Sequence, residues 1–204
     1  MHCSKSHRAV FPVVVSMVLL FVLLCSATPA PAQETPPPLD ETPSAVALAA
    51  EKRHALEASP MSPFMRIYVL QYMYQFAPDN ELILGLSYMN IKFDCGETHA
   101  PGVVVGLRHY LWKGLHAEYQ LWPAYDWFYE KNEDKYYNGF ELWNEGRIGY
   151  RFAIRLSDKV DLYITPQWAL GFGVYGGNKP ETFKEEVRDE PYFGAPLVFI
   201  GLGF

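Results

Sequence analysis

The chain has 204 residues, of which 16% are aromatic and 20% are charged, and its formal net charge is −6 at pH 7. This length indicates one domain. The acidic balance excludes the basic surface that proteins use to bind DNA or RNA, so we expect no nucleic-acid partner.

Residues 1–32 have the features of a secretory signal peptide. Lys5 and Arg8 form a basic start, residues 10–25 are almost entirely apolar, and Ala30 and Ala32 flank a cleavage site of small residues. The apolar run is short for a membrane-spanning helix. A lipoprotein signal ending at Cys25 is the alternative, but lipoprotein signals resemble one another in having a small residue where Leu24 stands. We therefore expect export.

Removal of residues 1–32 removes two basic residues and no acidic one. The remaining 15 basic and 23 acidic residues give a net charge of −8. Cys95 is then the only cysteine, so no intramolecular disulfide is expected. No remaining segment is long and apolar enough for a spanning helix, whereas a closed barrel can cross a membrane because its strands pair with one another.

Residues 33–63 read as a segment that precedes the main fold. Residues 33–43 contain four prolines and predict an extended linker. Residues 45–58 are rich in good helix formers and show no strand alternation, so a short helix is expected there. A weak first strand at residues 44–50 is the alternative.

From residue 64 onward the pattern changes to alternating strands. The predicted strands are 64–76, 81–93, 102–111, 115–129, 139–155, 161–175 and 192–204. Each has 10 to 17 residues, more than is usual in soluble proteins and suited to tilted strands that cross a membrane. Bacterial barrels have even strand numbers, so we expect eight, with the first strand before residue 64.

The predicted connections alternate in length. Residues 78–80, 112–114 and 157–159 are tight turns, and residues 94–101, 130–138 and 176–191 are long polar loops. Short turns at one rim and long loops at the other are typical of outer-membrane barrels. If residues 112–114 form a three-residue hairpin loop with a left-handed glycine, Arg108 faces Glu118 and Tyr110 faces His116.

The last predicted strand alternates up to the final residue. Phe204, Leu202 and Ile200 share one apolar face. This strand resembles the C-terminal signal strand of bacterial outer-membrane barrels. The resemblance implies two partners, the barrel-assembly machinery that reads this strand and outer-membrane lipid.

The alternation of apolar and polar residues is compatible with two kinds of barrel. A soluble lipocalin-like barrel turns its apolar face inward, and a membrane barrel turns it outward. Most strand glycines lie on the polar face, as expected for the crowded inside of a narrow barrel, and aromatic residues gather near strand ends. Both features, with the last strand, favour the membrane barrel.

An eight-stranded barrel is just wide enough for its inward side chains to fill it. The polar faces then supply a paired interior network, because unpaired buried charges are costly. Its predicted members are Arg108, His116, Glu118, Asp126, Glu141, Glu145, Arg147 and Arg151. We expect a plugged, monomeric barrel with no catalytic residues, no metal and no cofactor.

Other functions stay open. Arg108, His116 and Glu118 could form an acid–base site of an enzyme that modifies outer-membrane lipid, although no serine stands beside His116 on its face. A narrow transport channel is another alternative. Asp94, Cys95, Glu97 and His99 have zinc-ligand side chains, but polar residues are expected in an exposed loop anyway. The charged residues 181–190 fit a solvated loop or a partner-binding one.

Three stretches, residues 68–72, 85–92 and 116–123, together with residues 178–184, resemble a family of uncharacterised small outer-membrane β-barrel proteins of Gram-negative bacteria. The resemblance covers residues 64–204, implies a barrel in the outer membrane, and carries no known activity. We therefore expect an all-β, up-and-down transmembrane barrel with a short N-terminal helix: a signal peptide (1–32), a linker with that helix (33–63) and the barrel (64–204). Its expected role is structural or in surface interaction.

Overall fold

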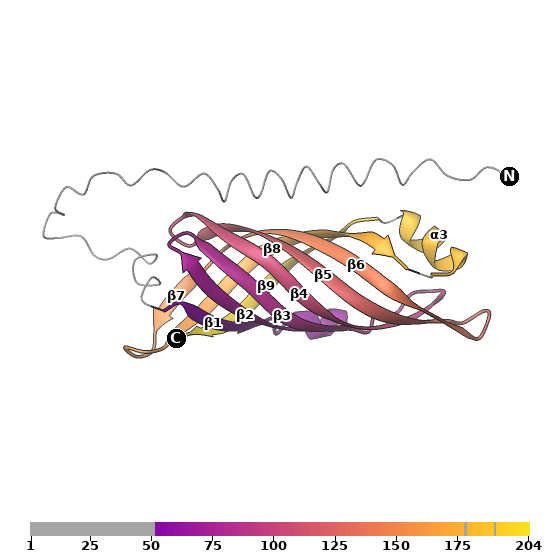
Figure 1. Ribbon diagram of the computed structural model, residues 1–204, viewed down its shortest axis with the longest axis horizontal. Coiled ribbons are helices and arrows are strands. Elements are labelled where there is room, and N and C mark those ends of the chain that lie inside the picture. The colour runs from indigo at the N-terminus through magenta and orange to yellow at the C-terminus, as the bar shows by residue number, and fades with distance from the viewer. Residues whose placement is uncertain (1–51, 178, 190) are drawn as a thin grey trace, which may run out of the picture. The chain divides into compact units, whose positions relative to one another are not determined.

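The computed structural model describes residues 52–177, 179–189 and 191–204. In this part of the chain, nine antiparallel strands form one sheet that closes in a ring, with one α-helix beside it (Figure 1). The expected signal peptide, the proline-rich segment and the alternative strand at 44–50 lie outside the described residues.

The strands follow one another around the ring. They are β1 (His54–Ala58), β2 (Ile67–Ala77), β3 (Asn80–Met89), β4 (Gly96–Trp112), β5 (Leu115–Glu130), β6 (Lys135–Tyr150), β7 (Phe152–Arg155), β8 (Asp161–Gly176) and β9 (Phe193–Gly203). A 3-10 turn, η1 (Ser62–Met65), precedes β2, and helix α3 (Glu181–Asp189) lies between β8 and β9. Strand β1 joins β2 to β9, and β6 pairs with β8 to close the ring.

Strands β6 and β7 are one line of chain interrupted at Arg151, because both pair with β8 in the same register. The nine strands therefore occupy eight positions in the ring. The interruption has a chemical cause. The pairs next to Gly149↔Gln167 would bring Tyr150 opposite Pro166, which has no N–H to donate to the ladder.

The first strand lies where the sequence predicts a helix. His54–Ala58 is β1, which pairs with both β2 and β9. His54 and Phe204 exchange two backbone hydrogen bonds of 2.8 and 3.1 Å. The predicted helix is therefore wrong for residues 54–58, whereas the expectation of a first strand before residue 64 is confirmed. Neighbouring strands on both sides outweigh the helix propensity of this short segment.

Two of the predicted long loops are mostly strand. Strand β4 begins at Gly96, inside the loop expected at 94–101, and β6 begins at Lys135, inside the loop expected at 130–138. Their ladders with β5 continue up to Glu130. The third predicted loop contains α3, which the sequence analysis missed. Figure 1 shows α3 at one end of the ring and the last residue near the other.

The turn between β4 and β5 keeps the predicted pairing but not the predicted geometry. Trp112 faces Leu115, and a bulge before Trp112 leaves Leu111 out of the ladder. Lys113, and not Gly114, has the left-handed conformation, with φ 51°. Gly114 is needed for another reason: a Cβ there would collide with the carbonyl oxygen of Arg151.

Two prolines weaken the seam between β4 and β5. Gly102 pairs with Ala124, but the pairs on both sides of it are missing from the ladder, next to Pro101 and Pro123. This pattern arises when both proline nitrogens face the same seam, because neither can donate a hydrogen bond. Two cross-strand bonds are therefore absent within a few residues of each other.

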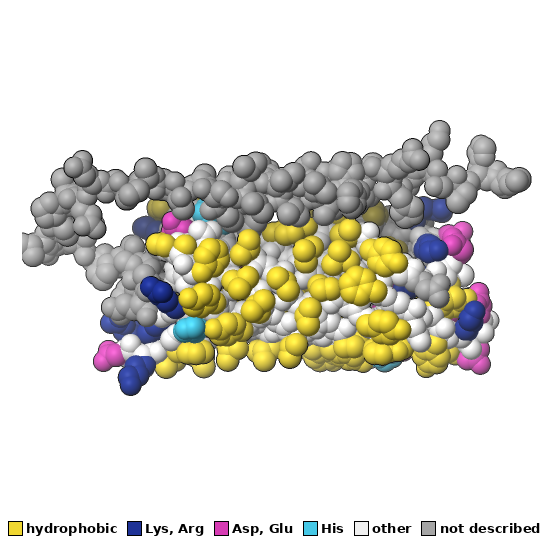
Figure 2. All heavy atoms as spheres, in the orientation of Figure 1, with side chains coloured by type: hydrophobic (Ala, Val, Ile, Leu, Met, Phe, Trp, Pro, Cys, Tyr) yellow, Lys and Arg dark blue, Asp and Glu magenta, His cyan; other side chains and the backbone are white. Residues whose placement is uncertain are grey.

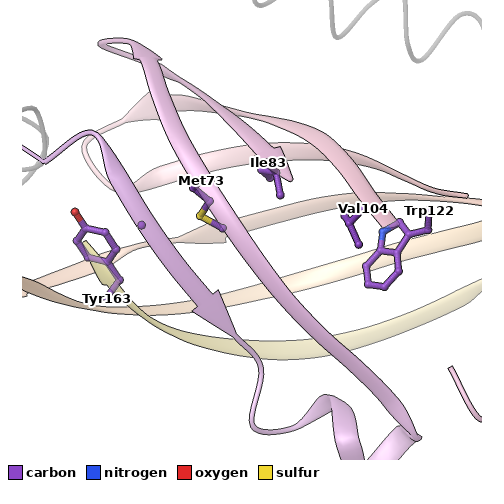
Figure 3. Close-up of a cluster of buried hydrophobic side chains, with 6 residues drawn as sticks. Met73, Ile83, Val104, Trp122 and Tyr163 are labelled. Atoms are coloured by element: carbon purple, nitrogen blue, oxygen red, sulfur yellow. The ribbon is translucent and has the colours of Figure 1, made fainter. Parts of the chain in front are cut away.

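A cluster of apolar side chains lies inside the ring. Met73, Ile83, Val104, Trp122 and Tyr163 come from five different strands and are at most 4% exposed (Figure 3). The five strands surround them, so this cluster is the core that the inward face of the sheet buries. A second apolar cluster, formed by Ala169, Leu197 and Phe199, and many polar and charged side chains are also buried.

Candidate functional site

The outward face of the ring is apolar over its middle. Large apolar side chains from every strand position are more than a third exposed, among them Leu56, Leu70, Leu86, Val105, Tyr125, Ile148, Phe152, Trp168 and Ile200. Figure 2 shows that, on the face in view, apolar side chains cover the middle and charged side chains gather at the two ends. Soluble monomers rarely expose a continuous apolar surface of this extent.

The residues predicted as an assembly signal belong to this outward face. Ile200, Leu202 and Phe204 are 45 to 49% exposed. Leu202 lies between Leu162 of β8 and Leu56 of β1, at the seam where the last strand meets the first.

The inward face carries the predicted charged residues. Seven of the eight are buried, and the side chain of Glu141 is 20% exposed. They do not form one cluster. Most lie in the half of the ring near the β4–β5 turn, and Asp126 and Glu141 lie in the half near α3.

Arg108 of β4 is the centre of the first group and is completely buried. Its Nε donates to Glu118 Oε1 at 2.6 Å, across the β4–β5 seam. Its terminal nitrogens donate to Glu57 Oε2 at 3.1 Å and to Glu81 Oε2 at 3.2 Å. One guanidinium therefore joins carboxylates from β1, β3 and β5.

Arg151, at the interruption between β6 and β7, holds two of the same carboxylates. Its terminal nitrogens donate to Glu57 Oε1 at 2.7 Å and to Glu81 Oε1 at 2.5 Å. Its guanidinium also lies 4.5 Å from the centre of the Tyr163 ring. Arg108 and Arg151 thus share Glu57 and Glu81 and connect opposite sides of the ring.

Arg147 and a set of amides complete this group. Arg147 pairs with Glu145 and lies 3.7 Å from Glu118 Oε2. Gln120 donates to Glu118 Oε2 at 2.9 Å and accepts from Gln71 and Trp122, each at 3.1 Å. Buried charges of both signs, joined by hydrogen bonds, fill this half of the interior.

His116 lies between the carbonyl oxygen of the β4–β5 turn and Glu118. It is completely buried, its Nδ1 lies 2.9 Å from the carbonyl oxygen of Gly114, and its Nε2 lies 3.4 Å from Glu118 Oε1. It pairs with Tyr110 of β4, next to the bulge at Leu111, and with Gly149 of β6.

Lys179 fills the other half of the interior, near α3. It follows β8, is 6% exposed, and forms an ion pair with Asp126. Its ammonium also lies 3.1 Å from Glu141 Oε1. The two predicted acids that are separate from the Arg108 group are therefore joined by a lysine that the sequence analysis did not assign to the interior.

Helix α3 is fixed over the end of the ring by a carboxylate and an aromatic side chain. Glu186 accepts from the backbone N–H of Asp94 at 2.9 Å and of Cys95 at 3.1 Å. Partial burial raises the pKa of Glu186, but the hydrogen bonds from the Cys95 thiol and from these two N–H groups lower it by more, so the pKa is lowered overall. Phe183 packs against Phe93 and Phe128, with ring centres 4.9 and 5.0 Å apart.

The four residues weighed as zinc ligands have other contacts. Asp94 and Cys95 bond to Glu186, whereas His99 lies 2.8 Å from the Tyr88 hydroxyl and 3.8 Å from Glu97. Within the described residues, no three His, Cys, Asp or Glu side chains are grouped to hold a metal ion. Burial, followed by the hydrogen bond to Glu186, raises the pKa of the Cys95 thiol to about 12.

Sequence reasoning missed several buried charged residues, among them Glu57, Glu81 and Lys179. Glu57 was placed in an expected helix, although it shares the alternation of β1 with Leu56 and Ala58 on the opposite face. Glu81 is the first residue of a predicted strand. It shares a face with Ile83 and Gly85, so its inward direction could have been predicted from them. Lys179 lies in a connection, and no periodicity indicates where such a side chain points.

Comparisons of the chain with protein-family models, curated proteins and solved structures give no match. Among the helices of the described residues, none has the length and hydropathy needed to cross a membrane.

Proposed function

We propose that the protein is a small outer-membrane β-barrel of the Gram-negative envelope, with a filled interior and a structural or surface-interaction role. The observation that carries the proposal is the arrangement of the two faces. Apolar side chains are exposed around the outside, and the charged side chains of the strands are buried inside. Water as the outer solvent would favour the opposite arrangement, whereas lipid favours this one.

The interior supports a barrel without a diffusion pore. Arg108 bonds directly to Glu57 and to Glu118, and all three side chains are completely buried. Charges held this way stay in place, because separating them leaves each unpaired in a confined interior. We therefore expect no conductance when the purified protein is added to planar lipid bilayers, and stepwise conductance would support the channel alternative.

The enzyme alternative has a separate test. An enzyme embedded in the barrel and acting on lipid would need a substrate path to His116. A deletion strain with an altered lipid acylation profile, restored by the natural gene and not by a His116→Ala variant, would replace our proposal with that alternative.

A charge placed on the outward face tests the membrane location directly. Leu86 is 69% exposed in the middle of β3. In lipid, Leu86→Arg should destabilise the folded protein by about 2–4 kcal/mol. In water, an exposed substitution of this kind changes stability by roughly 0.5 kcal/mol or less. Urea titration in lipid vesicles measures the difference.

The matched control is Asp158→Arg, which introduces the same side chain in the exposed turn between β7 and β8. Stability should be unchanged there. The natural protein should also fractionate with outer membranes and migrate faster on a detergent gel before boiling than after it. Recovery as a soluble periplasmic protein, with equal stability of both arginine variants, would contradict the proposal.

A further inference from the structure

The ammonium of Lys179 is surrounded by groups that recognise an ammonium. Asp126 forms an ion pair with it, and Glu141 Oε1 lies 3.1 Å away. The ring centres of Phe128 and Phe183 each lie 4.6 Å from Nζ. Carboxylates and aromatic faces together are the usual surroundings of a bound organic cation.

These surroundings are built mainly by the sheet and not by the loop that carries Lys179. Asp126 and Phe128 belong to β5, and Glu141 belongs to β6. Thr98 of β4 adds a hydroxyl 3.5 Å from Nζ. Only Phe183 and Lys179 itself come from the segment after β8. The sheet therefore presents the site whether or not Lys179 occupies it.

The site also has more acceptor capacity than Lys179 uses. Two carboxyl groups face one ammonium. Asp126 is completely buried, and its Oδ1 has no hydrogen-bond partner among the described residues. A buried carboxylate oxygen without a donor is costly, so the site favours a cation with several N–H groups.

We propose that this end of the ring is a recognition site for a primary ammonium group, which Lys179 fills as an internal ligand and an external amine must displace. The ligand class is a primary alkylammonium, such as a lysine side chain of another molecule or a polyamine. The inference goes beyond a structural role and does not depend on the membrane location.

Removal of the internal ligand should open the site to a small amine. Lys179→Ala deletes three methylene groups and the ammonium, so n-propylammonium replaces what is lost. Calorimetric titration of the detergent-purified protein should show n-propylammonium binding to Lys179→Ala at least about tenfold more tightly than to the natural protein, in which Lys179 competes. Asp126→Asn, added to Lys179→Ala, should abolish this binding.

Two controls separate ammonium recognition from cavity filling and from charge. The first is n-propanol, which has the same length without the charge and should bind Lys179→Ala at least about tenfold more weakly than the amine. The second is Lys184→Ala, which removes a lysine of α3 whose side chain is 49% exposed, and should bind the amine no better than the natural protein.

Three results would overturn the proposal: no amine binding to a folded Lys179→Ala protein, equal binding of n-propanol, or equal binding to the natural protein. Each would leave Lys179 as a structural tie of its loop. If Lys179→Ala does not refold, Lys179→Ser, which is also too short to reach Asp126, replaces it in the same comparison.

Discussion

Arg108 joins three buried carboxylates inside the ring. It bonds to Glu57, Glu81 and Glu118 from three strands, and none of these side chains is more than 6% exposed. Burial of a guanidinium is tolerated only with such partners, because the cost of leaving water must be offset by direct ion pairs and hydrogen bonds. A change at Arg108 therefore alters several strands at once.

The Arg108–Glu118 pair can be tested by a double-mutant cycle. Glu118→Gln should reduce the free energy of unfolding by about 3 kcal/mol, because it leaves part of the Arg108 charge uncompensated. The same change in an Arg108→Met background should cost much less. Urea unfolding of the refolded protein in detergent measures both values.

The control cycle uses Lys184 and Glu181, an ion pair 2.7 Å long on the exposed side of α3. Solvent screens such pairs, so we expect little coupling between these two residues. Equal coupling in the two cycles would mean that the interior pair contributes no more than a surface pair.

At the scale of elements, α3 is held mainly by Glu186. The pKa of Glu186 is lower in the folded state than its unfolded value of 4.5. Ionised Glu186 therefore stabilises the folded state fully at pH values above 4.5, and this stabilisation is lost as the pH falls through the lower, folded pKa. The contact of α3 with Cys95 should therefore persist at neutral pH and weaken only in acid.

Cys95 reports whether α3 is in place. Glu186→Gln should increase the rate of Cys95 alkylation at pH 8 at least about tenfold, because the raised pKa of the thiol depends on burial and on Glu186, and the thiolate is the reactive form. Peptide mass spectrometry locates the label. Glu185→Gln, on the exposed side of the same helix, is the control and should leave the rate unchanged.

Elements with a clear period were predictable, and elements that depend on neighbours were not. The alternation of side chains in β2, β3, β5, β8 and β9 predicted the bounds of each strand within a few residues. Each of these strands has one exposed face and one buried face, so its residue types alternate with a period of two. Strand β1 has only five residues, too few to show a period, and it exists because β2 and β9 pair with it.

The sequence of α3 contains features of a helix, but its many charged residues favoured the interpretation as a loop. Pro180 immediately before Glu181, and Phe183 and Val187 four residues apart, fit a short amphipathic helix. The position of Lys179 had no such signal. Its partners Asp126 and Glu141 are 53 and 38 residues earlier in the chain, so only the closed sheet brings them together.

At the scale of the whole molecule, the ring should open more easily between β4 and β5 than between β8 and β9. Fewer cross-strand bonds near Pro101 and Pro123 lower the free energy of local opening. Hydrogen exchange should therefore be faster in residues 98–106 and 120–128 than in the matching residues of β8 and β9, whose ladder is continuous. Equal protection of the two seams would show that packing compensates for the missing bonds.

Interior side chains also connect β4 and β5 across this seam. Where the backbone of β4 and β5 cannot hydrogen-bond, side chains on either side of the gap cross it: Arg108 reaches Glu118 below, and Thr98 Oγ1 reaches Asp126 Oδ2 at 3.4 Å above. These two side-chain contacts therefore join β4 to β5 on both sides of the gap, where the backbone ladder does not.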